Sequence, residues 1–192
     1  MRLWPLRDRA MRRAALLTGA SIALTLALVL LFRVGLPQRA TYTGFITNGS
    51  TRVAPELNAP APPFANPTLD GKIVTLEDLR GAPVIINFWA TWCVPCRVEM
   101  PALQRLYEDY EERGLRILAV NLGESPDVIE PWVREMGLTF DIVLDLEQKV
   151  AAMYRLRGQP STFVISPEGI IEHIRYGPVT LDTLRAQIGA YF

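Results

Sequence analysis

Hydrophobic positions between residues 64 and 192 follow two periods, one typical of strands and one typical of helices. Segments of strand length that are rich in apolar residues lie at residues 83–90, 115–122, 140–144, 162–165 and 170–176. Apolar residues at helical spacing fill the segment that ends at Gly114, residues 126–136 and 148–154, and the segment from Leu181. Helices and strands alternate at first, whereas the last two strands form a hairpin followed by a helix. This order predicts an α/β domain with a mixed central sheet and helices on both faces.

The start of this domain carries a turn signal of its own. Asp70 and Gly71 separate Thr68-Leu69 from Ile73-Val74, which predicts a small N-terminal hairpin. Residues 76–80 then have the length of one helical turn before the first long apolar run. We therefore expect the hairpin to precede the main sheet as an extension.

A separate hydrophobic run at residues 14–32 contains no charged residue. As a helix, its nineteen residues would cover about 28 Å, close to the thickness of a hydrocarbon core. Residues 1–13 carry five arginines against one aspartate, and the cytoplasmic flanks of membrane helices favour such basic residues. We therefore predict a basic cytoplasmic arm at 1–13, a transmembrane anchor at 14–32, and export of everything that follows.

A cleaved signal peptide is the competing interpretation of this run. Its apolar region would be shorter, about 7–15 residues, and a small-residue A-x-A cleavage site would follow. Residues 33–39 show no such pattern, so we favour a retained, single-pass anchor in the bacterial cell membrane. The remainder of the chain would then face an extracytoplasmic or periplasmic space.

Residues 33–63 separate the predicted anchor from the predicted domain. They combine five prolines with small and polar residues and lack a sustained period, which predicts a linker. Residues 64–192 are enough for one sizeable hydrophobic core. From Val34 onward acidic residues outnumber basic ones by 19 to 14, so we expect no nucleic-acid partner.

The two cysteines of the chain, Cys93 and Cys96, form a C-x-x-C motif where a buried strand gives way to a helix. A thiolate at a helix N-terminus receives unpaired N–H groups and the positive end of the helix dipole. Cys93 lies nearer the open end, so we expect it to have the lower pKa and to attack a partner disulfide. Cys96 would then resolve the mixed disulfide. Pro95 fixes φ in the first turn and suits the short ring of the oxidised pair.

Other uses of a C-x-x-C pair find less support in the sequence. A zinc site needs four ligands, and the chain has no third cysteine and one histidine, His173. A purely structural disulfide that closes so short a loop would remove little entropy from the unfolded chain. A peroxidase would carry Thr three residues before the reactive cysteine, and Ala90 occupies that position.

Two neighbours of the cysteine pair are further candidate site residues. Glu99 lies three residues after Cys96, one helical turn away, where it could hold or accept the proton that Cys96 must lose. The alternative is a glutamate that only complements the first turns of the helix. Trp92 borders Cys93 and offers a flat contact surface for a partner protein.

The segment from Asn87 to Pro101, NFWATWCVPCRVEMP, resembles the active-site segment of membrane-anchored thioredoxin-like proteins of the TlpA and ResA type. Residues 69–81, 120–124 and 158–163 resemble the same family in the expected order, so the resemblance runs from about residue 64 to the C-terminus. It implies a thioredoxin-like fold and an active-site role for Glu99. Asn87 occupies the strand position where cytoplasmic thioredoxins carry a buried aspartate.

The resemblance also implies where a substrate binds and what it is. Pro160 should follow a cis peptide bond and lie against the cysteine pair, so that Gln159 and Pro160 join Trp92 and Pro95 in contacting the partner. Members of the family usually act as reductants in an oxidising compartment, often on the haem-binding thiols of apocytochrome c. A membrane protein of the CcdA or DsbD type re-reduces them.

The resemblance implies no separate cofactor and no metal, because the two sulfur atoms of Cys93 and Cys96 carry the electrons. We expect a monomeric, membrane-anchored disulfide reductase that acts on disulfide-containing proteins. A disulfide oxidant or isomerase is one alternative. Another is a non-catalytic anchored binding module with an inert disulfide.

Overall fold

The structure, a computed structural model, describes residues 55–192. The predicted arm at 1–13 and the predicted transmembrane segment at 14–32 lie outside the described residues, as does most of the predicted linker. Between residues 55 and 192, no helix has the length and apolar character needed to cross a membrane. The N-terminal transmembrane helix therefore stays a prediction.

The secondary-structure elements follow the periods of the sequence. The strands are β1 (Ala65–Pro67), β2 (Ile73–Thr75), β3 (Val84–Trp89), β4 (Arg116–Leu122), β5 (Asp141–Asp145), β6 (Ser161–Ile165) and β7 (Ile171–Tyr176). The α-helices are α2 (Val94–Tyr110), α3 (Pro126–Met136), α4 (Lys149–Met153) and α5 (Leu181–Ile188). Short 3-10 turns lie at η1 (Leu76–Leu79), η2 (Glu111–Arg113) and η3 (Gly189–Tyr191). All strands predicted for the main sheet are present, with ends shifted by one residue.

The main sheet has the strand order β5-β4-β3-β6-β7. β3, β4 and β5 are parallel, whereas β6 is antiparallel to β3 and β7 is antiparallel to β6. β3 is therefore the central strand, and all six of its residues are buried. Because parallel strands end at the same edge of a sheet, the loops that follow β3 and β4 leave the sheet side by side.

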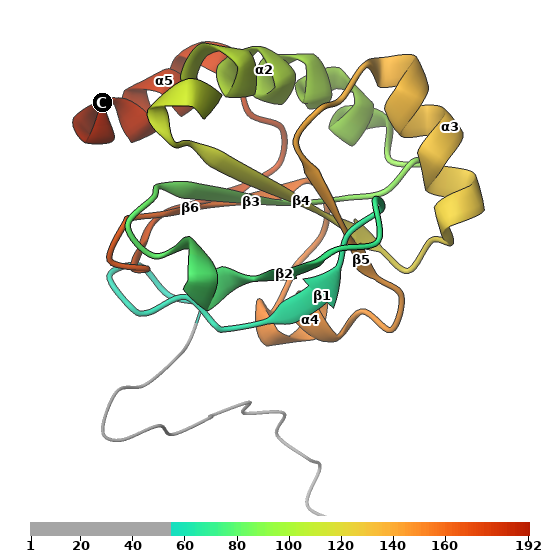
Figure 1. The fold of residues 1–192 in the computed structure, drawn as a ribbon, viewed down its shortest axis with the longest axis horizontal. Coiled ribbons are helices and arrows are strands. Elements are labelled where there is room, and N and C mark those ends of the chain that lie inside the picture. Colours follow the sequence, from blue (N-terminus) through green and yellow to red (C-terminus); the bar gives the residue numbers. More distant parts are fainter. Residues whose placement is uncertain (1–54) are drawn as a thin grey trace, which may run out of the picture. The chain divides into compact units, whose positions relative to one another are not determined.

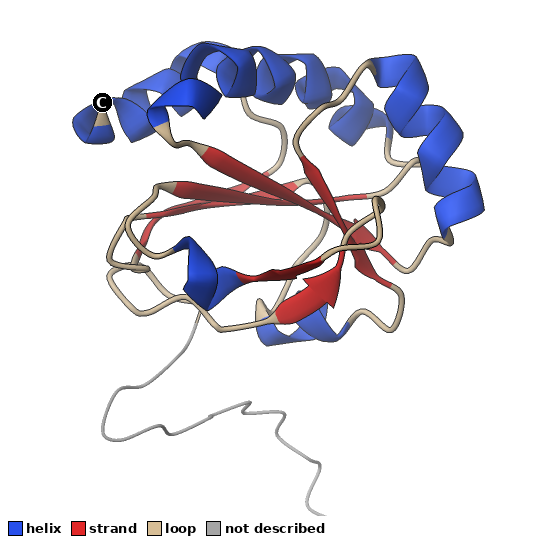
Figure 2. Cartoon of the chain, viewed as in Figure 1, coloured by secondary structure: helices blue, strands red, loops and turns tan. Residues whose placement is uncertain are grey.

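Helices cover both faces of this sheet (Figures 1 and 2). α2, α3 and α5 lie on one face, and α4 lies on the other together with the β1–β2 hairpin. Alternate residues of β3 serve the two cores: Ile85 and Trp89 pack in the core under α2, whereas Phe88 packs with Tyr154 after α4. The predicted mixed sheet with helices on both faces is confirmed.

The N-terminal hairpin is present and Ile73 and Val74 lie in its second strand as predicted, but its first strand lies further from the turn than predicted. β1 pairs with β2 through residues 65–67 and 73–75, and Thr68 and Leu69 do not join that ladder. The Thr68 N–H still donates to the Lys72 carbonyl at 2.8 Å. Both residues also bind the edge of the main sheet: Thr68 forms a bridge with Val143, and the Leu69 N–H donates to the Ile142 carbonyl at 2.8 Å. The contact between Leu69 and the open edge of β5 is one that local turn signals cannot show.

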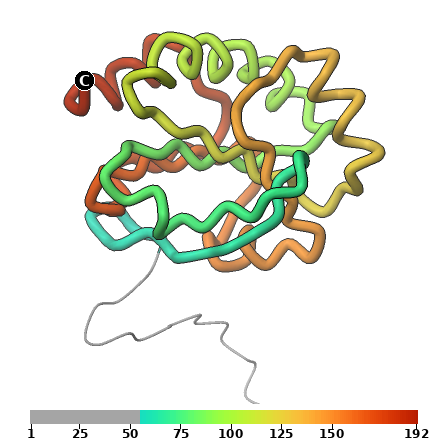
Figure 3. Tube along the Cα trace, viewed as in Figure 1, coloured from blue at the N-terminus to red at the C-terminus, as the bar shows by residue number. Residues whose placement is uncertain are grey.

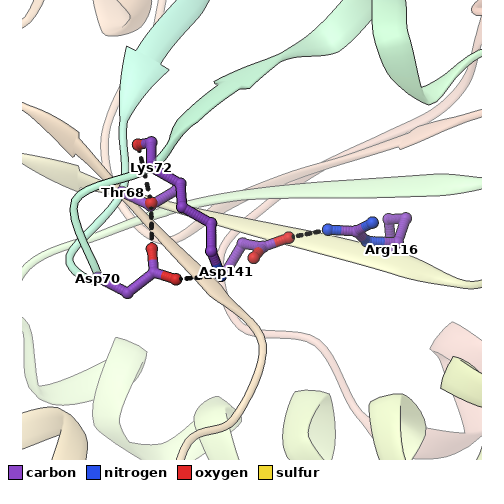
Figure 4. Close-up of polar contacts among 5 residues, drawn as sticks. All are labelled: Thr68, Asp70, Lys72, Arg116 and Asp141. Atoms are coloured by element: carbon purple, nitrogen blue, oxygen red, sulfur yellow. Dashed lines mark hydrogen bonds and ion pairs between the residues drawn. The ribbon is translucent and has the colours of Figure 1, made fainter.

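Charged side chains accompany this contact between the hairpin turn and the sheet edge (Figure 4). The Thr68 hydroxyl contacts the Asp70 carboxylate, and Lys72 pairs with Asp70 at 2.6 Å. On the sheet side, Arg116 of β4 pairs with Asp141 of β5. Exposed pairs of this kind contribute at most about 1 kcal/mol each, so the backbone hydrogen bonds determine the position of the hairpin.

The segment before Phe64 runs along the domain (Figure 3). The Asn58 N–H donates to the Ile171 carbonyl at 2.8 Å, and the Ile171 N–H donates to the Ala59 carbonyl at 2.9 Å. The buried Tyr154 hydroxyl donates to the Pro62 carbonyl at 3.0 Å. The packed part of the chain thus begins several residues before Phe64, because this segment covers the start of the β7 edge.

Candidate active site

The cysteine pair lies at the junction of the central strand and the first long helix. β3 ends at Trp89 and α2 begins at Val94, with Cys93 as the N-cap residue in an extended conformation. Cys93 and Cys96 form a disulfide with an S–S distance of 2.06 Å and a Cα–Cα distance of 5.3 Å. The predicted strand-to-helix position of the motif is therefore confirmed.

The start of α2 directs a backbone donor at the Cys93 sulfur. The Cys96 N–H donates to Cys93 Sγ across 3.3 Å, and Pro95 in the first turn has no N–H to offer. A thiolate at this position would receive the same N–H group together with the positive end of the helix dipole. The arrangement favours ionisation of Cys93 once the disulfide is reduced.

Cys93 and Cys96 differ in their access to solvent. Cys93 keeps 4% of its surface exposed, whereas Cys96 is fully buried. The surroundings of Cys93 are open: Trp92 is 66% exposed, and Val94 and Val98 are exposed as well. Exposed apolar side chains grouped around a reactive sulfur indicate a contact surface for another protein. The structure is consistent with attack by Cys93 and resolution by Cys96.

Glu99 points into the domain, away from solvent. Its side chain is only 1% exposed. Oε1 accepts from Asn87 Nδ2 at 2.8 Å, and Oε2 accepts from the Val179 N–H at 2.9 Å. Burial raises the pKa of Glu99 from 4.5 to about 7, although both hydrogen bonds act in the opposite direction. A glutamate that only complemented the helix dipole would lie in solvent, so this position favours the acid-base interpretation.

Asn87 connects Glu99 to the centre of the sheet. It is fully buried in β3, and its Nδ2 also donates to Thr162 Oγ1 of β6 at 3.0 Å. Sequence reasoning placed Asn87 by resemblance but assigned it no contact, and it did not single out Thr162 or Val179. The sequence did offer one signal for such a contact, because Asn87 is a polar residue within an otherwise apolar strand.

The loop before β6 lies at the same edge of the sheet as the cysteine pair. The Gln159–Pro160 peptide bond is cis, as the resemblance implies. Ser161, the next residue, pairs with Phe88 near the end of β3. Pro160 is buried and accepts a hydrogen bond from the Gly177 N–H at 2.9 Å, whereas Gln159 is half-buried. The antiparallel β3–β6 pairing thus carries Pro160 to the strand end that leads into Cys93.

A second glutamate, missed at the level of sequence, secures the loop before Cys93. The Glu124 carboxylate follows β4 and accepts hydrogen bonds from the Thr91 N–H at 2.7 Å and from the Thr91 hydroxyl. It also accepts from Asn121 Nδ2 at 2.8 Å. Glu124 therefore joins the loops that follow β3 and β4. Only the parallel pairing of these strands brings it near Thr91.

Cys93 and Cys96 are joined to each other in this structure. Within residues 55–192, no three His, Cys, Asp or Glu side chains gather in a way that could hold a metal ion.

Known proteins resemble the chain in sequence and in structure. The sequence profile described as the AhpC/TSA family matches residues 57–174. A thiol-disulfide oxidoreductase ResA from Geobacillus kaustophilus is 37% identical over 161 residues, which cover 84% of this chain and 89% of the relative. ResA from Oceanobacillus iheyensis is 42% identical over 120 residues, 62% of each protein. The crystal structure of StoA from Bacillus subtilis, 29% identical, matches 68% of this chain and 98% of its own with a TM-score of 0.59.

We expect the Cys93 thiol to have a pKa below the ordinary cysteine value of about 8.5, because the Cys96 N–H and the start of α2 stabilise its thiolate. The variant Cys96→Ser keeps that N–H and leaves Cys93 as the only thiol. The rate at which iodoacetamide alkylates Cys93, measured from pH 4 to 10, gives the midpoint of the thiol titration. The same variant unfolded in urea is the control, and equal midpoints in the two states would contradict the expectation.

For Glu99, we expect domain stability to decrease as the pH rises from about 4.5 to about 7. In this range the unfolded chain releases a proton that the buried carboxyl keeps, so the free energy of unfolding falls. The shift corresponds to roughly 3 kcal/mol, and Glu99→Gln should remove this part of the pH dependence. Urea unfolding at several pH values measures it. The exposed Glu112→Gln serves as control, and a profile shared by both variants would exclude Glu99 as the source.

Glu124→Ala should lower the free energy of unfolding by about 1–3 kcal/mol, because three donors lose a charged acceptor. Glu124→Gln should recover most of the loss, since an amide oxygen still accepts. The matched control is Glu130→Ala on α3, whose exposed pair with Arg134 is worth about 0.3–0.5 kcal/mol. Equal losses for the alanine variants would mean that Glu124 is an ordinary surface residue.

Proposed function

We propose that this chain, which belongs to the AhpC/TSA family and is a thiol-disulfide oxidoreductase of the ResA type, reduces disulfides in exported partner proteins. The observation that carries the proposal is the position of Cys93. Its sulfur is the N-cap of α2, accepts the Cys96 N–H and lies at an apolar, exposed rim. A sulfur so placed is suited to attack as a thiolate at neutral pH.

The reaction begins with the reduced pair. The Cys93 thiolate attacks one sulfur of the partner disulfide, a Cys93–partner S–S bond forms, and the partner's other sulfur leaves as a thiolate. The Cys96 thiolate then attacks Cys93 Sγ and displaces the second partner sulfur. The partner gains two electrons and two protons, and Cys93 and Cys96 are left as the disulfide seen in the structure.

Glu99 supplies the base for the second step. Cys96 is fully buried and has no access to bulk water, so its proton needs an acceptor inside the domain. Glu99 lies one turn further along the same helix, and its pKa of about 7 suits it to take a proton near neutral pH. Its hydrogen bonds to Asn87 and Val179 hold the carboxyl in place.

The proposed setting follows from the sequence and from the family. A single N-terminal helix anchors the protein in the bacterial cell membrane and the domain faces the extracytoplasmic side. The partner is a disulfide-containing protein, with the haem-binding cysteines of apocytochrome c as the proposed substrate. A CcdA or DsbD type membrane protein returns the electrons, the protein acts as a monomer, and no cofactor besides the cysteine pair takes part.

Trp92, Val94 and Val98 support a protein partner rather than a small-molecule one. All three are exposed beside the cysteine pair, where Pro95 is also exposed. Gln159 and Pro160 reach the same edge of the sheet through the β3–β6 pairing. An extended segment of the partner would therefore contact Trp92 and Pro95 on one side and Gln159 and Pro160 on the other.

The full chain should reduce the disulfides of insulin and of an oxidised apocytochrome c fragment when supplied with dithiothreitol. Cys93→Ser should abolish the activity, and Cys96→Ser should accumulate a mixed disulfide through Cys93, visible on non-reducing gels. Exchange at the wild-type rate by Cys93→Ser would remove Cys93 as the nucleophile. A bond that resists dithiothreitol would favour the inert binding module.

The redox potential separates the reductant from the oxidant or isomerase. A value near that of thioredoxin, about −270 mV, supports reduction, and a value near that of DsbA, about −120 mV, supports oxidation. Equilibration of the full chain with dithiothreitol or glutathione buffers measures it. Capture of the natural partner by Cys96→Ser in the native cell would identify the substrate.

A further inference from the structure

Asn87 is a buried polar side chain that holds Glu99 in place and takes no part in the bond changes of the proposed reaction. Its Nδ2 donates to Glu99 Oε1 at 2.8 Å and to Thr162 Oγ1 at 3.0 Å. Its Oδ1 is buried and has no hydrogen-bond partner among the residues that the structure describes. Both hydrogen bonds of the amide thus lie at one end, and nothing at the other end determines its orientation.

The two partners at that end can exchange their roles. The Thr162 hydroxyl can donate or accept, and a carboxyl accepts when ionised but donates from its protonated oxygen. The other oxygen of Glu99, Oε2, faces the Val179 N–H at 2.9 Å, which can only donate. A proton taken up by Glu99 is therefore favoured on Oε1, the oxygen that faces Asn87.

We propose that Asn87 is a positioning residue whose amide reverses when Glu99 gains or loses its proton. With Glu99 ionised, Nδ2 donates to Glu99 and Thr162, as in the structure. With Glu99 protonated, Oδ1 takes the place of Nδ2 and accepts from the Glu99 and Thr162 hydroxyls. Each state has two hydrogen bonds at this end of the amide, so Asn87 is hydrogen-bonded to Glu99 in both of its protonation states.

The inference rests on the proposed function, in which Glu99 exchanges a proton with Cys96. The groups that contact Glu99 are Asn87 of β3, which Thr162 of β6 supports, and the Val179 N–H after β7. Cys96 is buried one turn earlier on α2. Burial, and not a neighbouring charge, is the largest cause of its raised pKa. An aspartate in place of Asn87 would add a second titrating carboxyl and couple the two titrations, which the amide avoids.

The test is nuclear magnetic resonance of the oxidised full chain, labelled with ¹⁵N and ¹³C and kept in a mild detergent. Between pH 5 and 9, the Glu99 carboxyl carbon reports its protonation. The nuclear Overhauser effect between the Asn87 side-chain NH₂ and the Thr162 methyl group reports the orientation of the amide. We expect this effect to be strong at high pH and to weaken as the pH falls, with the same midpoint as the titration of Glu99. An effect that stays constant while Glu99 titrates would overturn the inference.

Glu99→Gln supplies a matched control. The Val179 N–H keeps the glutamine oxygen, so the glutamine NH₂ takes the place of Oε1 and holds Asn87 in the reversed orientation. The effect on the Thr162 methyl should then be weak at every pH, and a strong effect at high pH would contradict the inference.

Asn87→Leu tests the support that the amide gives to ionised Glu99. The variant removes one hydrogen bond from the ionised carboxylate and one from the protonated carboxyl, so the Glu99 midpoint should change by less than about one pH unit. A rise of about one to two units would mean that the amide supports the ionised state alone and would overturn the inference, and Glu99→Gln decides the question if the leucine variant does not fold. Disulfide reduction by the wild-type chain is assayed separately. A chain that reduced no disulfide would contradict the proposed function, whereas the NMR result on the Asn87 amide would still stand.

Discussion

The capping of α2 by the Cys93 sulfur is the contact on which the chemistry of this domain depends. A helix leaves its first N–H groups without internal partners, and here the Cys96 N–H is directed at Cys93 Sγ. The central strand β3 brings the motif to this position, because only four residues separate its end from the start of α2. Burial of β3 on both faces holds the strand and the helix together, so the core determines where the sulfur lies.

At Cys93 the surroundings favour the ionised sulfur, whereas at Glu99 they disfavour the ionised carboxyl. Burial disfavours its ionised form, and two hydrogen bonds partly offset that cost. The result is a group that can hold or release a proton near neutral pH next to a cysteine without solvent access. Asn87 and the Val179 N–H come from different parts of the chain, and each meets one oxygen of the carboxylate. The stability of the domain and its proposed chemistry therefore share these contacts.

Local periods and turn signals were enough to identify the elements of the main sheet and the position of the cysteine motif. A buried apolar strand followed, after three intervening residues, by C-x-x-C has few local alternatives, because the apolar run and the helix start both depend on near neighbours. The same holds for the helical turn at η1 and for the helices α3 and α4. The turn at Asp70 and Gly71 and the second strand after it were also identified, but not the residues of the first strand.

The sequence by itself determined which residues form the strands and helices and which two sulfur atoms pair, since these depend on contacts within a few residues. Only the tertiary structure decided that Thr68 and Leu69 join the edge of β5, that Glu124 holds Thr91, and that Asn87 meets Glu99. The residues in these contacts are 12 to 75 positions apart in the sequence. Strand order and register bring such groups together, and no pattern of nearby residues encodes them.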